Sequence, residues 1–164
     1  MTKQKESKTN AMRLLDAAGI SYSCLSYEAD EFEDGIHTAD ALGLDHEKVF
    51  KTLVTLGASR NYYVFVLPLT AKLDLKKAAK SVKEKSLEMI AVKDIKNITG
   101  YVRGGCTAIG MKKRYTTRID LSAKPWEDIY ISAGKIGYQL NIRTEDFLRI
   151  SGAEYADLSD LNVK

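Results

Sequence analysis

The sequence of 164 residues lacks the features that mark several large classes of protein. Its two cysteines, Cys24 and Cys106, are too few for a disulfide framework and fit a reducing compartment. No apolar run approaches the roughly 20 residues needed to cross a bilayer, and the polar first ten residues do not resemble a signal peptide. The net charge of +3, from 25 basic and 22 acidic residues, does not by itself indicate nucleic-acid binding. We therefore expect a soluble cytoplasmic protein.

The motifs of common metal and cofactor sites are also missing. The sequence contains no C-x-x-C and no H-x-x-x-H spacing, so it predicts no metal site. It contains no G-x-G-x-x-G, which leaves a dinucleotide site without support. Its two histidines, His37 and His46, lie in polar sequence typical of surface loops, so neither indicates a catalytic pair with a cysteine or a serine. No cofactor is expected.

Two apolar segments predict the centre of the fold. Val49–Leu56 and Tyr62–Leu69 are dominated by β-branched, aromatic and aliphatic residues, and residues 57–61 between them have the length of a hairpin connection. Their near-continuous apolarity predicts strands that are buried on both faces of a covered sheet. Further strands are expected at Ser21–Tyr27, Leu87–Val92, Tyr130–Ser132 and Tyr138–Ile142.

Short helices are expected between these strands. The caps and stop signals predict them at Ala11–Ala18, Thr38–Leu42, Leu75–Val82, from Asp94 to the residue before Gly100, and Glu145–Ile150. Thr9 or Asn10 is the predicted N-cap of the first helix, and Asp74, Asp94 and Thr144 are those of the last three. Because strands and helices do not alternate regularly, the pattern favours an α+β fold over a doubly wound sheet. We expect one domain over residues 1–164, with a flexible tail at 1–8 and a mixed, curved, barrel-like sheet flanked by short helices.

A glycine-rich loop is the strongest local signal of function. Four of the eleven glycines lie within Gly100–Gly110, and the basic run 111–114 follows directly. Such a density indicates positive φ angles or a ligand that approaches the backbone closely. Backbone N–H groups beside cations are typical of a site for an anion or an ester carbonyl. Met111 stands where a P-loop requires lysine, so a P-loop NTPase is not indicated, and a tight structural turn remains the alternative.

Two side chains leave a choice between packing and function. Lys51 lies within a strand that otherwise looks buried, so its ammonium either reaches past apolar neighbours to water or serves as a fixed cation. Cys106 has no histidine base in sight, and a small packing residue is the better interpretation than a nucleophile. One group of lysines is most simply a solvated helix face: Lys72, Lys76, Lys77, Lys80, Lys83 and Lys85. Together with Lys112, Lys113, Arg114 and Arg118, they could instead form a track for a phosphate backbone.

Five blocks of sequence occur in the same order in one known family. The sequence closely resembles the YbaK/EbsC group of aminoacyl-tRNA deacylases, relatives of the editing domain of bacterial prolyl-tRNA synthetase. This resemblance runs from about Ala11 to Asp160 and implies an α+β fold around a mixed, barrel-like sheet. It also implies trans-editing, the release of cysteine from mischarged Cys-tRNA(Pro) and from Cys-tRNA(Cys). The implied partners are tRNA and prolyl-tRNA synthetase, without a metal or cofactor. The blocks are Val49–Leu53, Leu73–Ala78, Thr99–Gly105, Gly110–Lys113 and Ile129–Gly137.

The resemblance also implies roles for individual residues. Lys51 would hold the terminal nucleotide of the tRNA, and the amides of Gly104 and Gly105 would face the substrate carbonyl. Two positions depart from the family pattern: Thr107-Ala108 replaces the usual Ser-Pro, and Gln139 replaces an aspartate. A glutamine can still hydrogen-bond a ribose or an α-amine. The implied substrate-binding residues are Tyr27, Thr52, Thr107, Ser132, Gly134, Gly137 and Gln139.

The implied mechanism uses no nucleophile from the protein. In the YbaK group the thiol of the substrate attacks its own ester and expels the tRNA as a cyclic thioester forms. The protein would then supply orientation and oxyanion stabilisation. Two alternatives stay open: a deacylase that uses water on another mischarged tRNA, such as alanyl- or seryl-tRNA, and a module without catalysis that binds a tRNA 3′ end or an adenine nucleotide.

Overall fold

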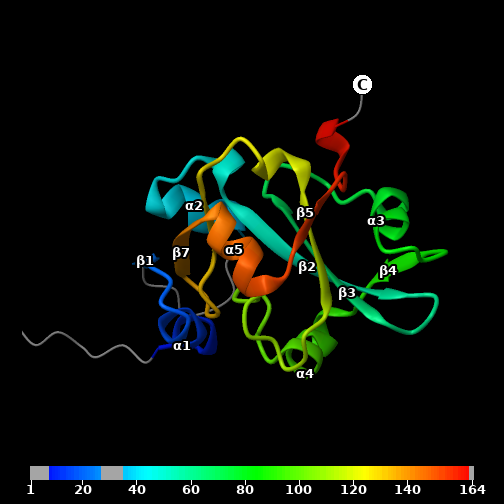
Figure 1. Ribbon diagram of the computed structural model, residues 1–164, viewed down its shortest axis with the longest axis horizontal. Helices are drawn as coiled ribbons and strands as arrows, with labels where there is room; N and C mark the ends of the chain where they lie inside the picture. The colour runs from blue at the N-terminus through cyan, green and yellow to red at the C-terminus, as the bar shows by residue number, and fades with distance from the viewer. Residues whose placement is uncertain (1–7, 27–34, 163–164) are drawn as a thin grey trace, which may run out of the picture.

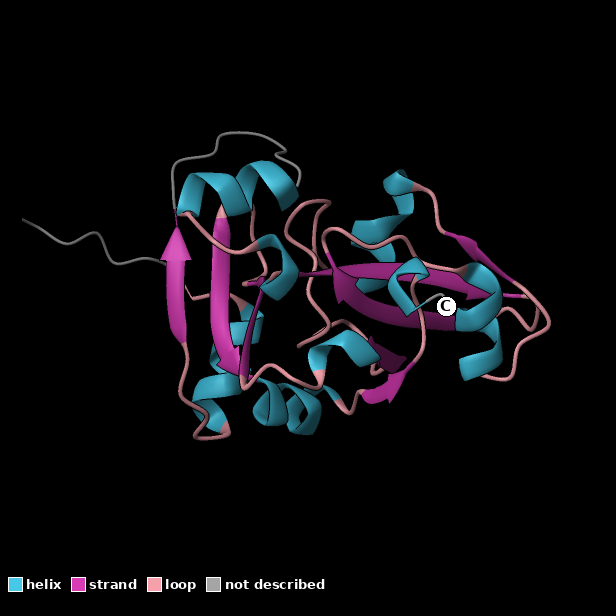
Figure 2. Cartoon of the chain, turned by 90° about the horizontal axis from the view of Figure 1, so that it is seen from above, coloured by secondary structure: helices cyan, strands magenta, loops and turns pink. Residues whose placement is uncertain are grey.

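The computed structural model describes residues 8–26 and 35–162 of the chain. Two β-sheets of unequal size lie beside each other, and short helices surround them (Figures 1 and 2). Most of the predicted tail, residues 1–7, and the predicted pocket residue Tyr27 lie outside the described residues. None of the described helices is long and apolar enough to cross a membrane.

The larger sheet is built around the predicted hairpin. β2 (Phe50–Gly57) and β3 (Tyr62–Pro68) pair antiparallel, with Lys51 opposite Leu67. β3 is the central strand, and its residues from Val64 to Pro68 are buried, as their apolar sequence predicts. The full strand order is β4-β2-β3-β5-β8. β4 (Leu87–Met89) is antiparallel to β2. β5 (Thr116–Asp120) is parallel to β3, and β8 (Glu154–Ala156) is parallel to β5.

The smaller sheet has the order β1-β7-β6 and is antiparallel throughout. It consists of β1 (Ser23–Ser26), β6 (Asp128–Ser132) and β7 (Tyr138–Arg143). A single isolated parallel bridge between Val49 and Tyr130 joins it to the start of β2 in the larger sheet. The prediction of a mixed α+β fold is confirmed, with the barrel-like sheet divided into these two parts.

The helices cover the sheets and are mostly ended by the residues that the sequence indicates. Thr9 caps α1 by accepting a hydrogen bond from the N–H of Met12, and Asp74 caps α3 by accepting from two backbone N–H groups. Asp94 stands at the predicted N-cap position of α4, but its side chain makes no capping bond. The predicted cap Thr144 is wrong, because Arg143 is the N-cap of α5. The hydroxyl of Thr144 instead donates to the C=O of Trp126 at 2.7 Å, which ties α5 to the segment before β6. The helices are α1 (Asn10–Ala17), α2 (Gly35–Leu42), α3 (Leu75–Ser81), α4 (Ile95–Thr99) and α5 (Thr144–Ser151).

Two hydrophobic clusters hold these layers together. The main one lies between the smaller sheet, the start of β2, α1 and α5, and burying one of its large side chains stabilises the fold by about 1.5–3 kcal/mol. A second cluster lies between α3 and the larger sheet, around Phe65 and Leu158. Beside it the buried carboxylate of Asp120 accepts a hydrogen bond from the N–H of Leu158 at 2.9 Å and one from the hydroxyl of Ser122 at 2.7 Å. The core of the main cluster includes Leu15, Phe50, Ile129, Ile131, Leu140 and Phe147.

The sequence did not predict β5 or β8. β5 begins two residues after the basic run, and Thr117 and Ile119, which share one face of the strand, are both buried. Its neighbours β3 and β8 are far away in the chain, so the pairing that makes it a strand is not visible in its local pattern. The predicted strand Leu87–Val92 is also shorter than expected, because a 3₁₀ turn begins at Val92.

Candidate active site

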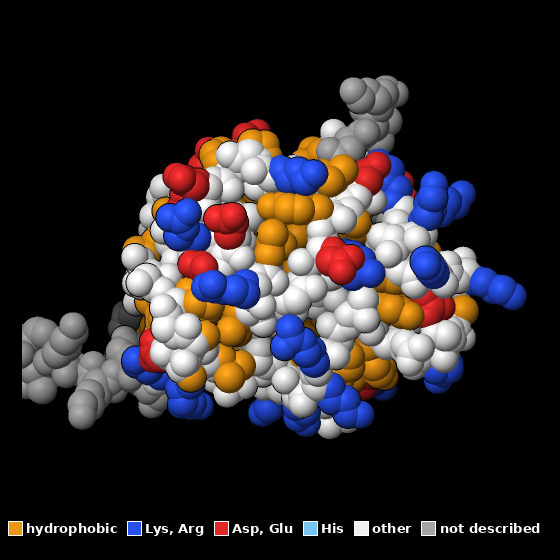
Figure 3. Space-filling model, viewed as in Figure 1, with side chains coloured by type: hydrophobic (Ala, Val, Ile, Leu, Met, Phe, Trp, Pro, Cys, Tyr) orange, Lys and Arg blue, Asp and Glu red, His pale blue; other side chains and the backbone are white. Residues whose placement is uncertain are grey.

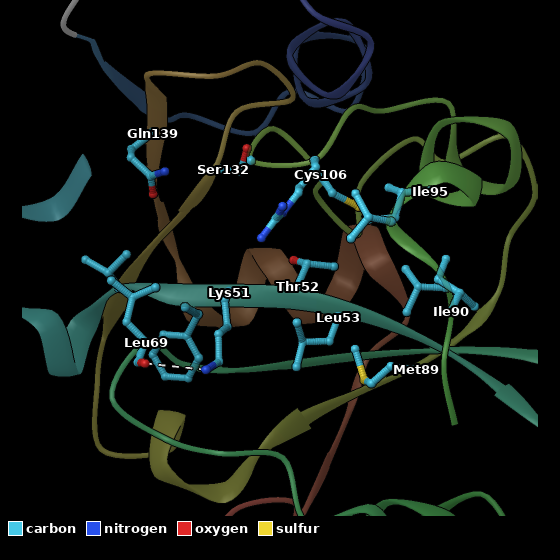
Figure 4. A pocket seen from close by; sticks show the side chains of 16 residues that line it. Lys51, Thr52, Leu53, Leu69, Met89, Ile90, Ile95, Cys106, Ser132 and Gln139 are labelled. Carbon is cyan, nitrogen blue, oxygen red and sulfur yellow. Dashed lines mark hydrogen bonds between the residues drawn. The ribbon is translucent and has the colours of Figure 1, made fainter. Parts of the chain in front are cut away.

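A cavity of about 490 Å³ lies between β2, the glycine loop and the end of the smaller sheet (Figure 4). Its polar side chains are Lys51, Thr52, Arg103, Ser132 and Gln139. The segment from β4 to α4 supplies an apolar wall. The apolar residues of that wall are Met89, Ile90, Val92 and Ile95, and they face Leu53 of β2.

The structure brings part of the predicted site together in this cavity. Lys51, Thr52, Gly104, Ser132 and Gln139 line it, although they come from four separate segments of the chain. The other predicted residues within the described part of the chain are not among those that line the cavity. These are Gly105, Thr107, Gly134 and Gly137.

Lys51 is held in place by backbone carbonyl groups. Its Nζ donates to the C=O of Ala71 at 2.6 Å and, more weakly, to the C=O of Leu69 at 3.4 Å. An ammonium has three N–H donors, so one is left for a ligand. Burial lowers the pKa of Lys51, and the nearby carboxylate of Asp160 partly offsets this effect. The side chain is thus a fixed cation at the cavity wall.

The two adjacent glycines of the loop differ in what they do. Gly104 has φ +87° and is the third residue of a turn that is closed by the N–H of Gly105, which donates to the C=O of Val102 at 2.9 Å. The N–H of Gly105 is therefore already used within the loop, whereas the N–H of Gly104 takes no part in that closing bond. A Cβ atom on Gly105 would lie 2.8 Å from the Cα of Lys135. Gly105 thus permits close approach of the loop to the β6–β7 turn.

The β6–β7 turn has a similar division of roles. The Oγ of Ser132, at the cavity, accepts a hydrogen bond from the N–H of Gly134 at 3.2 Å. Gly134 has φ +103°, and a Cβ atom there would lie 2.9 Å from the ring of Tyr101. These contacts indicate that Gly134 shapes the turn that presents Ser132.

The start of α1 ties the two loops to one another. The hydroxyl of Thr9 donates to the C=O of Ala133 at 2.6 Å, and the side-chain amide of Asn10 donates to the C=O of Gly110 at 2.8 Å. Within the glycine loop, the hydroxyl of Tyr101 donates to the C=O of Ile109 at 2.6 Å, and burial raises the pKa of Tyr101 to about 12. From the sequence, Thr9 and Asn10 were predicted only as alternative helix caps, because contacts between residues 100 or more positions apart leave no local pattern.

Two further residues at the cavity differ in reactivity. Burial raises the pKa of the Cys106 thiol to about 11, so at neutral pH the sulfur is protonated and a poor nucleophile. Gln139 is only 7% exposed, and its Oε1 has no hydrogen-bond partner among the described residues. Figure 4 shows this side chain pointing from β7 toward β2. A buried acceptor without a partner is costly, so Gln139 offers a ligand a strong place to donate.

Several cavity residues were missed by the sequence reasoning. Arg103 precedes Gly104 within a recognised block, and its place in the turn was the available signal. Met89 and Val92 are 45% and 54% exposed and line the same cavity, and apolar side chains exposed together are a feature of ligand-binding grooves. Lysine and arginine side chains also gather on one face of the molecule, over α1 and α4 and beside α3 (Figure 3). No group of three or more potential metal ligands is found in the described part of the chain.

Comparisons with known proteins agree on one family. Residues 34–150 match the aminoacyl-tRNA editing domain. Over 160 residues the chain is 38% identical to the Enterococcus faecalis protein named "Putative Cys-tRNA(Pro)/Cys-tRNA(Cys) deacylase EbsC", and the match covers 96% of both chains.

Solved structures show the same fold at low sequence identity. A "putative trans-editing enzyme for prolyl tRNA synthetase" superposes with a TM-score of 0.78 and 20% identity, over 94% of this chain and 99% of that one. A crystal structure described as a hypothetical protein superposes with a TM-score of 0.83 and 18% identity, over 93% of this chain and 100% of that one.

Proposed function

This chain belongs to the aminoacyl-tRNA editing domain family, as a deacylase of the YbaK/EbsC group, and we propose that it releases cysteine from Cys-tRNA(Pro) and Cys-tRNA(Cys). The proposal takes its substrates from the name of the 38% identical relative. The observation that carries it is the chemistry of the cavity. A fixed cation, a glycine turn and an unpaired amide acceptor all line this cavity, while neither of the two histidines does.

The substrate itself supplies the nucleophile in the proposed mechanism. The thiol of the cysteinyl group attacks its own ester carbonyl, and a C–S bond forms as the C–O bond to the terminal ribose breaks. The thiol proton goes to the departing ribose oxygen, and the cyclic thioester is later hydrolysed by water. Because Cys106 remains protonated and no histidine lines the cavity, a thiol in the substrate fits this site better than one in the protein.

The residues of the protein would then hold and polarise the substrate. We assign the N–H of Gly104 to the carbonyl oxygen, where one donor of this kind contributes about 2.7–4 kcal/mol to the transition state. Gln139 would accept a hydrogen bond from the α-ammonium of the cysteinyl group, and Lys51 would contact the terminal ribose and phosphate. The N–H of Gly105 has no part in this assignment, because it closes the turn to Val102.

The size of the cavity supports a ligand larger than an amino acid. Pockets of roughly 300–1,000 Å³ hold drug-sized ligands, and the present cavity of about 490 Å³ lies within that range. An aminoacylated nucleoside fits this size class, with the ester near the polar residues and the base against the apolar wall.

A panel of charged tRNAs tests the proposed substrate. Cys-tRNA(Pro), Cys-tRNA(Cys), Ala-tRNA(Pro) and a seryl-tRNA would be incubated with catalytic amounts of the protein. We expect turnover of the two cysteinyl substrates only, since only they carry the thiol. Comparable turnover of seryl- or alanyl-tRNA would indicate attack by water. No turnover of any substrate would favour the alternative function, a non-catalytic module that binds a tRNA 3′ end or an adenine nucleotide.

A substitution tests the fixed cation in the same assay. Lys51→Ala should lower kcat/KM for Cys-tRNA(Pro) by about tenfold or more, because a charge-assisted hydrogen bond contributes about 1.5–3 kcal/mol. Lys124→Ala is a suitable control, since this exposed lysine does not line the cavity. Deacylation by Lys51→Ala at the wild-type rate would contradict the assigned role.

We also infer that prolyl-tRNA synthetase assists this deacylase. A chain of 164 residues has little surface with which to select one tRNA, so a partner that already holds tRNA(Pro) would supply that selection. Adding the synthetase should then increase turnover of Cys-tRNA(Pro) but not of Cys-tRNA(Cys). An equal effect on both substrates, or none, would contradict this inference.

A further inference from the structure

Within the described part of the chain, no strand covers the middle of the edge of β2 that faces away from β3, where this edge borders the cavity. Six consecutive residues, Val49–Val54, line this one cavity, although neighbouring side chains of a strand point to opposite faces. Only the edge of the strand can present all of them together. On this edge β4 pairs with residues 55–57, and the N–H of Ile90 reaches the C=O of Val54 at 3.3 Å. At the other end the Val49–Tyr130 bridge is isolated, so the described strands leave residues 50–53 without a strand partner there.

The register of the hairpin identifies the peptide groups at this edge. Leu69 N–H donates to the C=O of Val49 at 2.9 Å, and Gly57 N–H donates to the C=O of Asn61 at 2.8 Å. Odd-numbered residues of β2 therefore direct their backbone groups toward β3, and even-numbered residues direct theirs away from it. The C=O of Phe50 and the N–H of Thr52 consequently point to the cavity side, as a neighbouring acceptor and donor.

We infer that this acceptor–donor pair binds the adenine of the 3′-terminal nucleotide of the tRNA. The N6 amino group of adenine donates to the C=O of Phe50, and N1 accepts from the N–H of Thr52. Guanine and uracil present the opposite order of donor and acceptor, so the open edge selects against them. The inference rests on the proposed function, because the terminal nucleotide of every tRNA is an adenosine and carries the ester.

The apolar wall completes a site for a flat base. Met89 and Val92 remain about half exposed, and Leu53, Ile90 and Ile95 surround the same end of the cavity. In Figure 4 this end lies away from Ser132 and Gln139. Unstacked bases of RNA are bound in this way, with side chains against the ring faces and hydrogen bonds to the Watson–Crick edge. The cavity thus divides into an apolar end for the base and a polar end for the ester.

Binding of nucleosides tests the base site without any requirement for turnover. The probes are adenosine, 1-deazaadenosine, which lacks the N1 acceptor, inosine, which reverses the donor and acceptor, and 7-deazaadenosine, which keeps the Watson–Crick edge. Dissociation constants and backbone amide shifts would be measured by NMR titration of the full chain. We expect 1-deazaadenosine and inosine to bind about 5- to 100-fold more weakly than adenosine, because a backbone group is then left unpaired. 7-Deazaadenosine should bind like adenosine, and adenosine should shift the amide signal of Thr52.

A variant tests the same contact from the side of the protein. Thr52→Pro removes the proposed donor, and proline is tolerated at an open edge because no ladder hydrogen bond is lost. This variant should bind adenosine more weakly than the wild-type protein does. It should bind 1-deazaadenosine as the wild-type protein does, because this nucleoside lacks the N1 acceptor for the removed N–H. Met89→Ala provides a second test that keeps the backbone intact, and it should weaken all four nucleosides by a similar factor.

The outcomes separate this inference from the proposed function. If all four nucleosides bind equally, or adenosine leaves the Thr52 amide unchanged, the base site is wrong even when Cys-tRNA is deacylated. If the adenosine preference is found while no charged tRNA is turned over, the base site stands and the proposed deacylation of Cys-tRNA fails.

Discussion

Replacing Gly105 by alanine tests whether close contact between the two loops sets the geometry of the site. Gly105 has no positive φ angle, so alanine is compatible with its backbone conformation. Its Cβ atom would nevertheless lie 2.8 Å from the Cα and 3.0 Å from the carbonyl carbon of Lys135. Both are backbone atoms that cannot rotate away. The substitution therefore forces the glycine loop and the β6–β7 turn apart.

The size of the effect follows from this overlap. Ordinary contact begins at 3.4 Å, so the loops must separate by about 0.6 Å (3.4 minus 2.8). Overpacking of this kind costs about 1–3 kcal/mol, which for a chain of this length lowers Tm by roughly 2–12 °C. Misplacement by about 1 Å can lower activity 100-fold, so we expect kcat/KM to fall by about 10- to 100-fold.

Thermal unfolding and deacylation of Cys-tRNA(Pro) would be measured on the same preparations. Gly19→Ala is the matched control, since Gly19 has φ +72° and nothing lies within 4 Å of the added Cβ. It should lose stability through backbone strain of about 1–2 kcal/mol and keep wild-type kcat/KM. A Gly105→Ala protein with the wild-type Tm and the wild-type kcat/KM would refute the reasoning.

Three further predictions concern buried groups. Cys106→Ala should remain a folded, active deacylase, and a folded but inactive variant would contradict this prediction. In the unchanged protein, the rate of Cys106 alkylation by iodoacetamide should keep rising with pH until the pH approaches the thiol pKa of about 11. Because the pKa of Lys51 is lowered in the folded protein, the unfolded chain binds more protons than the folded one just below pH 10.5. The free energy of unfolding should therefore rise with pH in that range, relative to the Lys51→Met variant, and urea titrations at several pH values would measure it. Asp120→Ala should lower the free energy of unfolding by about 3 kcal/mol, because the N–H of Leu158 and the hydroxyl of Ser122 lose their acceptor. Asp120→Asn keeps one side-chain oxygen and should lower it less in the same urea assay.

Local patterns predicted the parts of the fold that local chemistry determines. The β2–β3 hairpin was predicted because its apolar runs and connection length are features of neighbouring residues. The Thr9 and Asp74 caps were predicted for the same reason. β5 was missed because it becomes a strand only by pairing with distant segments, and Thr144 was misread because its hydroxyl finds a carbonyl 18 residues away.

The candidate site divides in the same way. Lys51, Gly104 and Ser132 were predicted from sequence blocks, and the structure places them in one cavity, although their roles remain proposals. Met89 and Val92 could not be predicted, because in sequence they look like ordinary strand residues and only their exposure at the cavity reveals them. The open edge of β2 is invisible in sequence, since it depends on which strands fail to reach it.

The open edge of β2 also bears on the solubility of the protein. Unpaired strand edges recruit strands from other molecules and so promote aggregation. Here the opening spans the four residues 50–53, about 13 Å, between the Tyr130 bridge at Val49 and the Ile90 contact at Val54. Such a gap admits a nucleobase but is too short for the strand of another chain, and its flanking segments block extension at both ends. The same walls that form the cavity therefore protect the chain from self-association through this stretch of β2.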